Sequence, residues 1–222
     1  MKRARSQIEK QEREKAILEG AWKLLQRKTC ESLTMDEVAS AAGLAKGTLY
    51  LYFGSKEALF LSLIESQLSP LVADINRWLN EQAGDATPES AAAYIARSFN
   101  RKRSLARMIL LIFPVLEDTL DIELSCRFKE TVGSYSEEMG RALESAITGM
   151  PHGSGSKLSI LALGLGAVLY HTSHTSSAFR RIMESPAQGG PYLNSDNTFE
   201  QILSTAMRLA VGCGDSSVRS PR

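Results

Sequence analysis

The chain has 222 residues, of which 43% are hydrophobic and 23% are charged, and this composition indicates a folded protein with one large domain or two small ones. The formal net charge of +1 excludes a strongly basic or acidic protein, but the charges are unevenly distributed. Residues 1–56 hold 11 Lys and Arg against 7 Asp and Glu, whereas the remaining residues hold 15 against 18. A basic N-terminal quarter is typical of a region that contacts a polyanion, although many solvated helices carry a similar excess.

The cysteines and the apolar segments exclude several classes of protein. Cys30, Cys126 and Cys213 are odd in number and far apart, so we expect neither a zinc site nor a disulfide framework. We expect instead that they are reduced cysteines of a cytoplasmic protein. The basic N-terminus has no apolar run behind it, unlike a signal peptide. The longest apolar stretch, residues 158–170, is shorter than the roughly 20 residues that span a bilayer, so we expect a buried helix there.

Helical periodicity dominates the chain and no segment alternates as a strand does, so the predicted fold is all-α with about nine helices. The first helix is predicted over about residues 7–27. Its apolar stripe consists of Ile17, Ala21, Leu24 and Leu25, which recur at the spacing of one helix face.

A short second helix is predicted between a capping box and a glycine. The Thr34 hydroxyl can accept the amide of Glu37, whose side chain can reach back to the start of the helix. Gly43 then ends this helix, because glycine adopts the left-handed conformation at low cost. A third short helix is predicted over about residues 45–52.

A long fourth helix is predicted after Ser55, with apolar positions from Leu59 to Trp78. Thr87 and Pro88 mark the next start, since proline at the first helical position loses no hydrogen bond. Pro114 should kink or split its segment. Further helices are predicted over 88–102, 104–118, 121–148, 157–183 and 198–211, with loops at 149–156 and 185–197.

The second and third helices, joined through Gly43, form a candidate helix-turn-helix unit. In the third helix, Leu49 and Phe53 lie four residues apart and are assigned to the core. A second stripe carries hydrogen-bond donors and small residues, as expected of a helix that lies deep in a DNA major groove. This stripe consists of Lys46, Gly47, Thr48 and Tyr50.

The run LTMDEVASAAGLAKGTLYLYFGSKEALFLSLIE resembles the DNA-binding domain of the TetR family of bacterial transcriptional repressors. The resemblance covers about residues 10–64 and depends on the L-T start, A-G-L, G-T-L-Y-x-Y-F and S-K-E-x-L. The rest of the chain matches only in the number and length of its helices. The resemblance therefore implies a DNA-binding domain at 10–64, followed at 65–213 by a larger helical domain that binds an effector and dimerises.

The resemblance also implies roles for residues at matching positions. The first three residues of the third helix would face base edges, its two tyrosines would contact the DNA backbone, and the starts of the second and fourth helices would each hold a phosphate. The DNA-binding residues so implied are Thr34, Lys46, Gly47, Thr48, Tyr50, Tyr52 and Lys56. Thr34 as a pure helix cap and Tyr52 as a packing residue remain alternatives.

The segment from about residue 157 to 175 is apolar on nearly all faces, so it must be buried against several neighbours. The resemblance implies that the last two long helices pair with those of a second copy in a four-helix bundle. A central core helix of a monomer is the alternative. Aromatic, methionine and histidine residues that could surround an effector, each also explicable as a core residue, are Phe99, Met108, Phe113, Phe128, Tyr170, His171 and His174.

Metal and enzymatic sites have little support in the sequence. His171 and His174 share a helix face, but neither the Glu-x-x-His pairs of a di-iron bundle nor an H-E-x-x-H motif is present, so no metal or cofactor is expected. The loop at 153–157 lacks the spacing of a phosphate-binding loop, and G-x-S-x-G is absent. We expect no enzymatic activity.

These observations predict a homodimeric transcriptional repressor that binds a near-palindromic operator and is released by a small hydrophobic effector. The fourth helix, which runs from the first domain into the second, is the natural lever between them. A co-repressor-dependent regulator or an activator is an alternative. A ligand-binding or interaction module that keeps the helix-turn-helix only as a scaffold is another.

Overall fold

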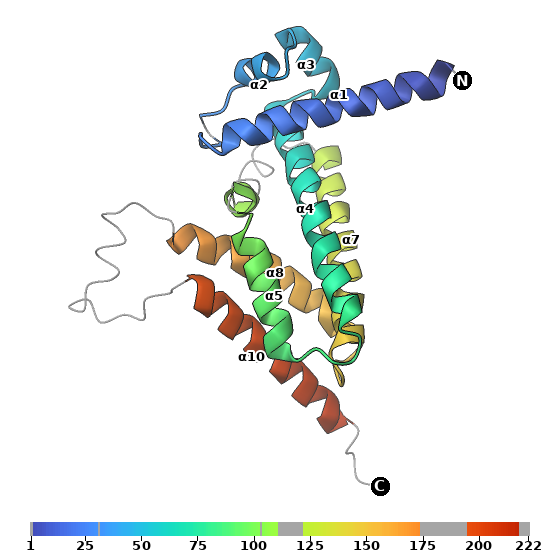
Figure 1. Ribbon diagram of the computed structural model, residues 1–222, viewed down its shortest axis with the longest axis vertical. Helices are drawn as coiled ribbons and strands as arrows, with labels where there is room; N and C mark the ends of the chain where they lie inside the picture. Colours follow the sequence, from blue (N-terminus) through green and yellow to red (C-terminus); the bar gives the residue numbers. More distant parts are fainter. Residues whose placement is uncertain (1, 31, 103, 111–121, 174–194, 218–222) are drawn as a thin grey trace, which may run out of the picture. The chain divides into compact units, whose positions relative to one another are not determined.

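The structure is a computed structural model of the chain, and it is helical throughout its ordered elements (Figure 1). No strand occurs in the residues that it describes, so the all-α prediction is confirmed. The backbone is described for residues 2–30, 32–102, 104–110, 122–173 and 195–217. Side chains are described for residues 7–30, 32–102, 104–110, 122–169 and 197–213.

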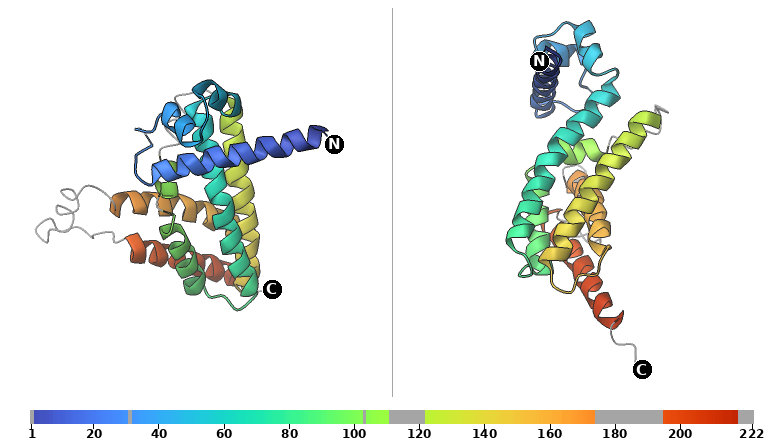
Figure 2. Two further views of the ribbon diagram at one scale, coloured as in Figure 1. Left: turned by 45° about the horizontal axis from the view of Figure 1, so that its top comes forward. Right: turned by 90° about the vertical axis from the view of Figure 1, so that its right-hand side faces the viewer.

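The chain divides into two compact units. The first contains α1 (Lys2–Leu25), α2 (Met35–Ala41), α3 (Lys46–Tyr52), the start of α4 (Lys56–Glu81) and the first turns of α7 (Ile122–Ala146). Within this unit α2 packs against both α1 and α3, and Figure 2 shows the two short helices side by side. The predicted order of a long helix, two short helices and another long helix is therefore confirmed.

The apolar stripe of α1 packs into the core of the first unit. Ile17 and Ala21 are fully buried and Leu25 is nearly so, whereas Leu24 is only half-buried. The helix begins at Lys2, earlier than predicted, since the charged residues before the stripe are good helix formers. These extra turns extend beyond the buried stripe.

The second unit contains α5 (Pro88–Asn100), α8 (Ser154–Ser173) and α10 (Ser195–Ser217), with the remainder of α4 and α7. The helices α5, α8 and α10 pack against one another. Residues 104–110 are also helical. The predicted capping of α5 is confirmed, because the Thr87 hydroxyl accepts the amide of N3 and proline occupies the first position.

Two aromatic rings form the centre of this three-helix contact. Phe99 of α5 and Phe199 of α10 meet edge to face, with ring centroids 5.9 Å apart. A Cβ atom at Gly166 of α8 would lie 3.1 Å from Phe199, so glycine makes room for the rings. Gly166 thus serves packing inside the unit.

The start of α8 differs from the prediction. We expected a loop through residue 156, but the helix begins at Ser154. The cause is a long-range cap, because a Glu144 carboxylate oxygen on α7 accepts the Gly155 amide at 3.0 Å and its other oxygen lies 3.0 Å from His152 Nδ1. A carboxylate at a helix N-terminus satisfies an orphan amide, and sequence periodicity does not reveal a cap supplied by another helix. The last helix likewise begins three residues before the predicted position 198.

The helices α7 and α8 approach most closely at a pair of glycines. A Cβ atom at Gly140 would lie 2.4 Å from the backbone nitrogen of Ser156, and one at Gly155 would lie 2.1 Å from the Gly140 carbonyl oxygen. Both clashes are with backbone, which has no flexible end to move aside. The crossing therefore depends on having no side chain at either position.

The helix α4 passes from the first unit into the second and contains a proline. The Ser55 hydroxyl accepts the Ala58 amide at 3.1 Å, which confirms the predicted cap. Pro70 lies exposed inside the helix, two residues after the point where the compact units divide. It has no amide hydrogen to donate to the Ser66 carbonyl, so one rung of the helical ladder is missing there. By length and hydropathy α4 could cross a membrane, but half of the relevant segment is buried in the protein, as in a core helix.

A matched pair of substitutions on α7 tests the tight crossing. Gly140→Ala should lower the free energy of unfolding by about 3 kcal/mol, because the new methyl group meets the backbone of α8. Gly133→Ala should instead raise it by about 0.5–1 kcal/mol, because nothing lies within 4 Å and alanine favours the helix. Urea unfolding of both variants measures the difference. Equal effects of the two substitutions would contradict the crossing.

Candidate DNA-binding surface

The start of α2 is fixed by the predicted capping box. The Thr34 hydroxyl accepts the Glu37 amide at 3.3 Å, and a Glu37 carboxylate oxygen accepts the Thr34 amide at 3.1 Å. Lys28 also donates to Glu37. The Lys28 ammonium and then the Thr34 amide hold the pKa of Glu37 below its ordinary value, so the carboxylate stays charged in its capping role. Thr34 itself remains exposed at this helix start.

The turn between α2 and α3 is the glycine turn that the sequence predicts. Gly43 has a φ of +66°, in the left-handed region. Its amide donates to Ser40 at 3.1 Å, and the Leu44 amide donates to Ala39 at 2.8 Å. This pair of bonds is the Schellman arrangement, which ends a helix and sets the direction of the following chain. The position of α3 therefore depends directly on Gly43.

The inner face of α3 packs into the domain as predicted. Leu49 is fully buried and Phe53 is 6% exposed, which confirms both as core residues. The opposite face is open: Tyr50 is 42% exposed and Leu51 is 81% exposed. Leu51 is the most exposed large apolar side chain in the described part of the chain.

The first turn of α3 presents small and charged groups to solvent. Lys46 and Gly47 are exposed and Thr48 is half-buried. A Cβ atom at Gly47 would meet nothing within 4 Å, so the protein itself does not require glycine there. The cost of glycine in a helix, about 1 kcal/mol against alanine, is therefore not explained by packing. Open space at this position leaves room for another molecule to approach the backbone.

An ion pair joins the first turns of α2 and α3. The Lys46 Nζ atom lies 3.0 Å from Asp36 Oδ2. The hydrogen bond with Asp36 raises the pKa of Lys46 above its ordinary value, so the ammonium is fully charged at neutral pH. Sequence analysis did not identify Asp36, because the two residues are ten positions apart and only the turn at Gly43 brings them together.

Tyr52 and Lys56 mark the far side of this surface. Both side chains are half-buried, and the Lys56 ammonium lies 5.4 Å from the centroid of the Phe60 ring. The structure therefore places all seven sequence-predicted residues on α3 or on the starts of its neighbouring helices. It adds Leu51, whose exposed position between the two tyrosines was the available signal, since an apolar residue away from the buried face stands out.

Comparison with known proteins agrees with this arrangement over most of the chain. The family model described as "Bacterial regulatory proteins, tetR family" matches residues 17–63. The family model described as "Tetracyclin repressor-like, C-terminal domain" matches residues 65–208. The chain belongs to the TetR family of transcriptional regulators. The helix-turn-helix predicted from the sequence is therefore confirmed as a DNA-binding fold.

Individual TetR-family relatives match in different ways. The HTH-type transcriptional regulator EthR of Mycolicibacterium smegmatis is 46% identical over 54 residues, which are 24% of this chain and only 25% of EthR. A TetR-family regulator from Mesorhizobium loti superposes with a TM-score of 0.60 at 16% identity, covering 92% of this chain and 97% of that one. The regulator FadR of Bacillus subtilis, solved in complex with stearoyl-CoA, superposes with a TM-score of 0.55 at 18% identity. The match covers 86% of this chain and 97% of FadR. At such identities the two structures show a shared fold.

The predicted effector residues are only partly described. Phe99 and Met108 are buried in the second unit, and Phe128 is buried in the part of α7 that belongs to the first unit. Tyr170 and His171 lie on α8, but their side chains are outside the described residues. Phe113 and His174 lie outside the described residues altogether.

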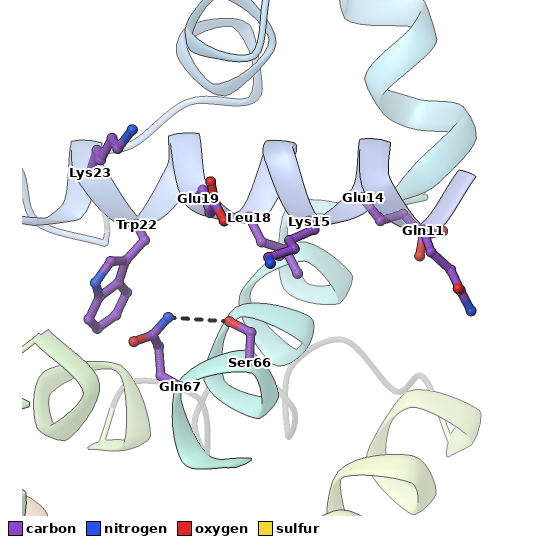
Figure 3. Close-up of a pocket in the computed structure, with 9 residues that line it drawn as sticks. All are labelled: Gln11, Glu14, Lys15, Leu18, Glu19, Trp22, Lys23, Ser66 and Gln67. Atoms are coloured by element: carbon purple, nitrogen blue, oxygen red, sulfur yellow. Dashed lines mark hydrogen bonds between the residues drawn. The ribbon is translucent and has the colours of Figure 1, made fainter. Parts of the chain in front are cut away.

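A groove of about 480 Å³ lies between α1 and α4 in the first unit (Figure 3). None of the predicted effector residues lines it. Its walls carry both acidic and basic side chains, together with Trp22 and the neighbouring Ser66 and Gln67. This mixture of charges does not point to one class of ligand, and we assign no function to the groove.

Substitution of the α2 cap separates its two candidate roles. Thr34→Asp keeps a good capping side chain, so the free energy of unfolding should change by less than about 0.5 kcal/mol. The added charge should repel a phosphate at this helix start and weaken duplex binding at least about tenfold. Fluorescence anisotropy measures the affinity and thermal unfolding measures the stability.

The control for this substitution is Thr34→Asn, which caps the helix without a charge. If Thr34→Asp bound DNA as tightly as Thr34→Asn, Thr34 would be a helix cap and nothing more.

Proposed function

We propose that this TetR-family regulator is a homodimeric repressor, which binds a near-palindromic operator and releases it when a small hydrophobic effector binds. In this proposal residues 10–64 form the DNA-binding domain and residues 65–213 the effector-binding and dimerisation domain. The observation that carries it is the outer face of α3, which is exposed and chemically suited to DNA although its inner face is firmly anchored. Because the proposed partner is bacterial DNA, the proposed location of the protein is the cytoplasm.

The contacts proposed for α3 follow from its exposure. Lys46, Gly47 and Thr48 would meet base edges, with glycine allowing the helix to approach closely. Leu51 is the side chain best placed for a thymine methyl group, since it is apolar and 81% exposed. Tyr50 is well exposed for a backbone contact.

The remaining contacts are with the phosphates and fix orientation. Thr34 and Lys56 stand at the starts of α2 and α4, where orphan amides favour anions. Tyr52 is half-buried, so it combines a packing role with a backbone contact through its hydroxyl. Phosphate contacts carry no sequence information and position the helix that does.

Dimerisation is supported by apolar side chains that the single chain leaves exposed. They follow one stripe on α8 and another on α10, and each is at least 41% exposed: Ile160, Leu161, Val168, Ile202 and Leu209. Such surfaces are unusual on a monomer and are explained when a second copy covers them. A twofold dimer in turn matches a palindromic operator. This favours the dimer over the alternative in which α8 is the core helix of a monomer.

The proposal of a hydrophobic effector is supported by the composition of the second unit and by a protein of the same fold. Phe99 and Met108 are buried aromatic and thioether side chains of the second unit, and FadR, which shares the fold, was solved in complex with stearoyl-CoA. An apolar effector with few polar anchors would be compatible with such surroundings. Its binding would favour a dimer state with poor affinity for DNA, with a coupling free energy typically of about 1–3 kcal/mol.

Two alternatives remain distinct from this proposal. A co-repressor-dependent regulator or an activator would reverse the sign of the effector's influence and use the same surfaces. An interaction module that kept the helix-turn-helix as a scaffold would not explain the open face of α3. We propose no enzymatic activity or metal site, and in the described part of the chain no three His, Cys, Asp or Glu residues cluster as metal ligands do.

Glutamate substitution in the exposed stripes tests dimerisation. Ile160→Glu and Leu209→Glu should each raise the dimer dissociation constant at least about a hundredfold, because an unpaired charge would be buried in the interface. Ile8→Glu is the control, since Ile8 is equally apolar and 55% exposed on α1. Sedimentation velocity shows the outcome, and a dimer that survived both substitutions would rule out this interface.

The DNA-binding proposal is tested by selecting duplexes from a randomised library and measuring the affinity of the wild-type protein for them. Binding to selected duplexes should persist at moderate salt, whereas binding to scrambled duplexes should fall steeply. The same assay then screens acyl-CoA and fatty-acid probes for release. If the protein enriched no sequence, it would not be a specific regulator.

A further inference from the structure

The Asp36–Lys46 ion pair lies on the proposed DNA-binding surface and is not explained by folding. Its carboxylate belongs to the first turn of α2 and its ammonium to the first turn of α3. The two side chains are 63% and 56% exposed. Exposed pairs of this kind contribute little to stability, because water screens them and ordering two side chains costs entropy.

A carboxylate at this place also opposes DNA binding in general. It repels phosphates, and it occupies a lysine that would otherwise be free to approach them. Lysine has a long flexible stem, so without a partner its ammonium samples many positions near a duplex. The Asp36 carboxylate weakens binding to every DNA sequence unless a favourable contact with a base offsets its repulsion. A repulsive group of this kind produces specificity, because only the sequences that supply the contact are bound tightly.

The pair matches the major-groove edge of one type of base pair. Guanine presents the acceptors N7 and O6, and the cytosine paired with it presents the donor N4. The O6 and N4 atoms are joined by a Watson–Crick hydrogen bond of about 2.9 Å. Lys46 Nζ and Asp36 Oδ2, a donor and an acceptor, lie 3.0 Å apart. The two protein atoms therefore have the spacing and the polarity that complement O6 and N4.

An A·T pair suits the ion pair less well. Adenine N6 and thymine O4 also form a donor and an acceptor side by side, but the carboxylate would then lie next to adenine N7, another acceptor. The ammonium would lie next to the thymine methyl group. On a G·C pair the ammonium instead gains a second acceptor, N7, and the carboxylate meets no competing lone pair.

We propose that Asp36 and Lys46 act as one unit that reads a G·C base pair in each operator half-site. Lys46 donates to guanine O6 and N7, and Asp36 accepts from cytosine N4 while it keeps the ammonium away from the phosphates. Asp36 is thus a specificity-determining residue. This inference rests on the proposed DNA-binding function and assigns to it one base pair and a residue outside the set implied by the sequence.

The experiment is a parallel selection from a randomised duplex library with the wild type, Asp36→Ala, Lys46→Met and the double variant. The wild-type pool should hold a G·C pair at one fixed position of each half-site. Each single variant should lose at least about tenfold of that preference, and the double variant should lose no more than either single variant, because one unit has been removed. Preferences at the other positions should persist.

Anisotropy with the wild-type consensus duplex and a scrambled duplex adds a readout that a structural role would not affect. Asp36→Ala should bind the scrambled duplex about three- to tenfold more tightly at low salt, with a salt slope steeper by about 0.9, because the released lysine reaches one more phosphate. In the Lys46→Met background this steepening should vanish. The control is Glu89→Gln, which removes the carboxylate that lies 3.1 Å from Arg208 and should change neither preference nor slope.

The outcomes are distinct. If Asp36→Ala kept the wild-type G·C preference, or if the steeper salt slope persisted without Lys46, the proposal that the two residues read one base pair together would be overturned. The proposed function as a DNA-binding regulator would not be affected by that result. If the wild type enriched no sequence, the proposed function and this inference would both fail. Thermal unfolding of all variants checks that the compared proteins are folded.

Discussion

A helix of seven residues is not stable by itself in water, so the proposed DNA-binding surface depends on what holds α3 in place. Two constraints do so. Leu49 is fully buried against the domain, which fixes the rotation of the helix, and the left-handed turn at Gly43 fixes the direction from which it starts. Because of these constraints Leu51 points outward and Lys46 meets Asp36. The chemistry of the surface is therefore set by a core residue and a turn residue that lie outside the proposed contacts.

The second unit uses glycine for a different purpose. At Gly140 and Gly155 two helix backbones meet directly, and at Gly166 a helix makes room for aromatic rings. Such close packing concentrates the core on one side of α8. The helix is nevertheless apolar on nearly all faces, so its other side is left with exposed Ile160 and Val168. One sequence pattern thus supplies both a core and an exposed apolar surface, which is the surface proposed above for dimerisation.

Sequence analysis succeeded where structure is decided locally. The caps at Thr34 and Thr87 and the turn at Gly43 involve residues three or four positions apart, and all three are confirmed. It failed where the fold brings distant groups together. The cap that Glu144 supplies to α8 shifted a predicted helix start, and the Asp36 contact was not foreseen. An effector pocket is of the same kind, because its lining converges from several helices and leaves no periodic signal. The predicted pocket residues accordingly stay predictions.

The backbone hydrogen bond that Pro70 cannot make has a consequence for hydrogen exchange along α4. In a continuous helix, opening one turn weakens the next, so amide hydrogens along it exchange with solvent in a coordinated way. Here the ladder is interrupted beside the point where the compact units divide. The amides before Ser66 are then protected by the stability of one unit, and those after Pro70 by the stability of the other. Along this single helix, hydrogen exchange would therefore report on the proposed DNA binding in its first half and on the proposed effector binding in its second, so a ligand that slowed exchange on both sides of Pro70 would reveal how strongly the two units are coupled.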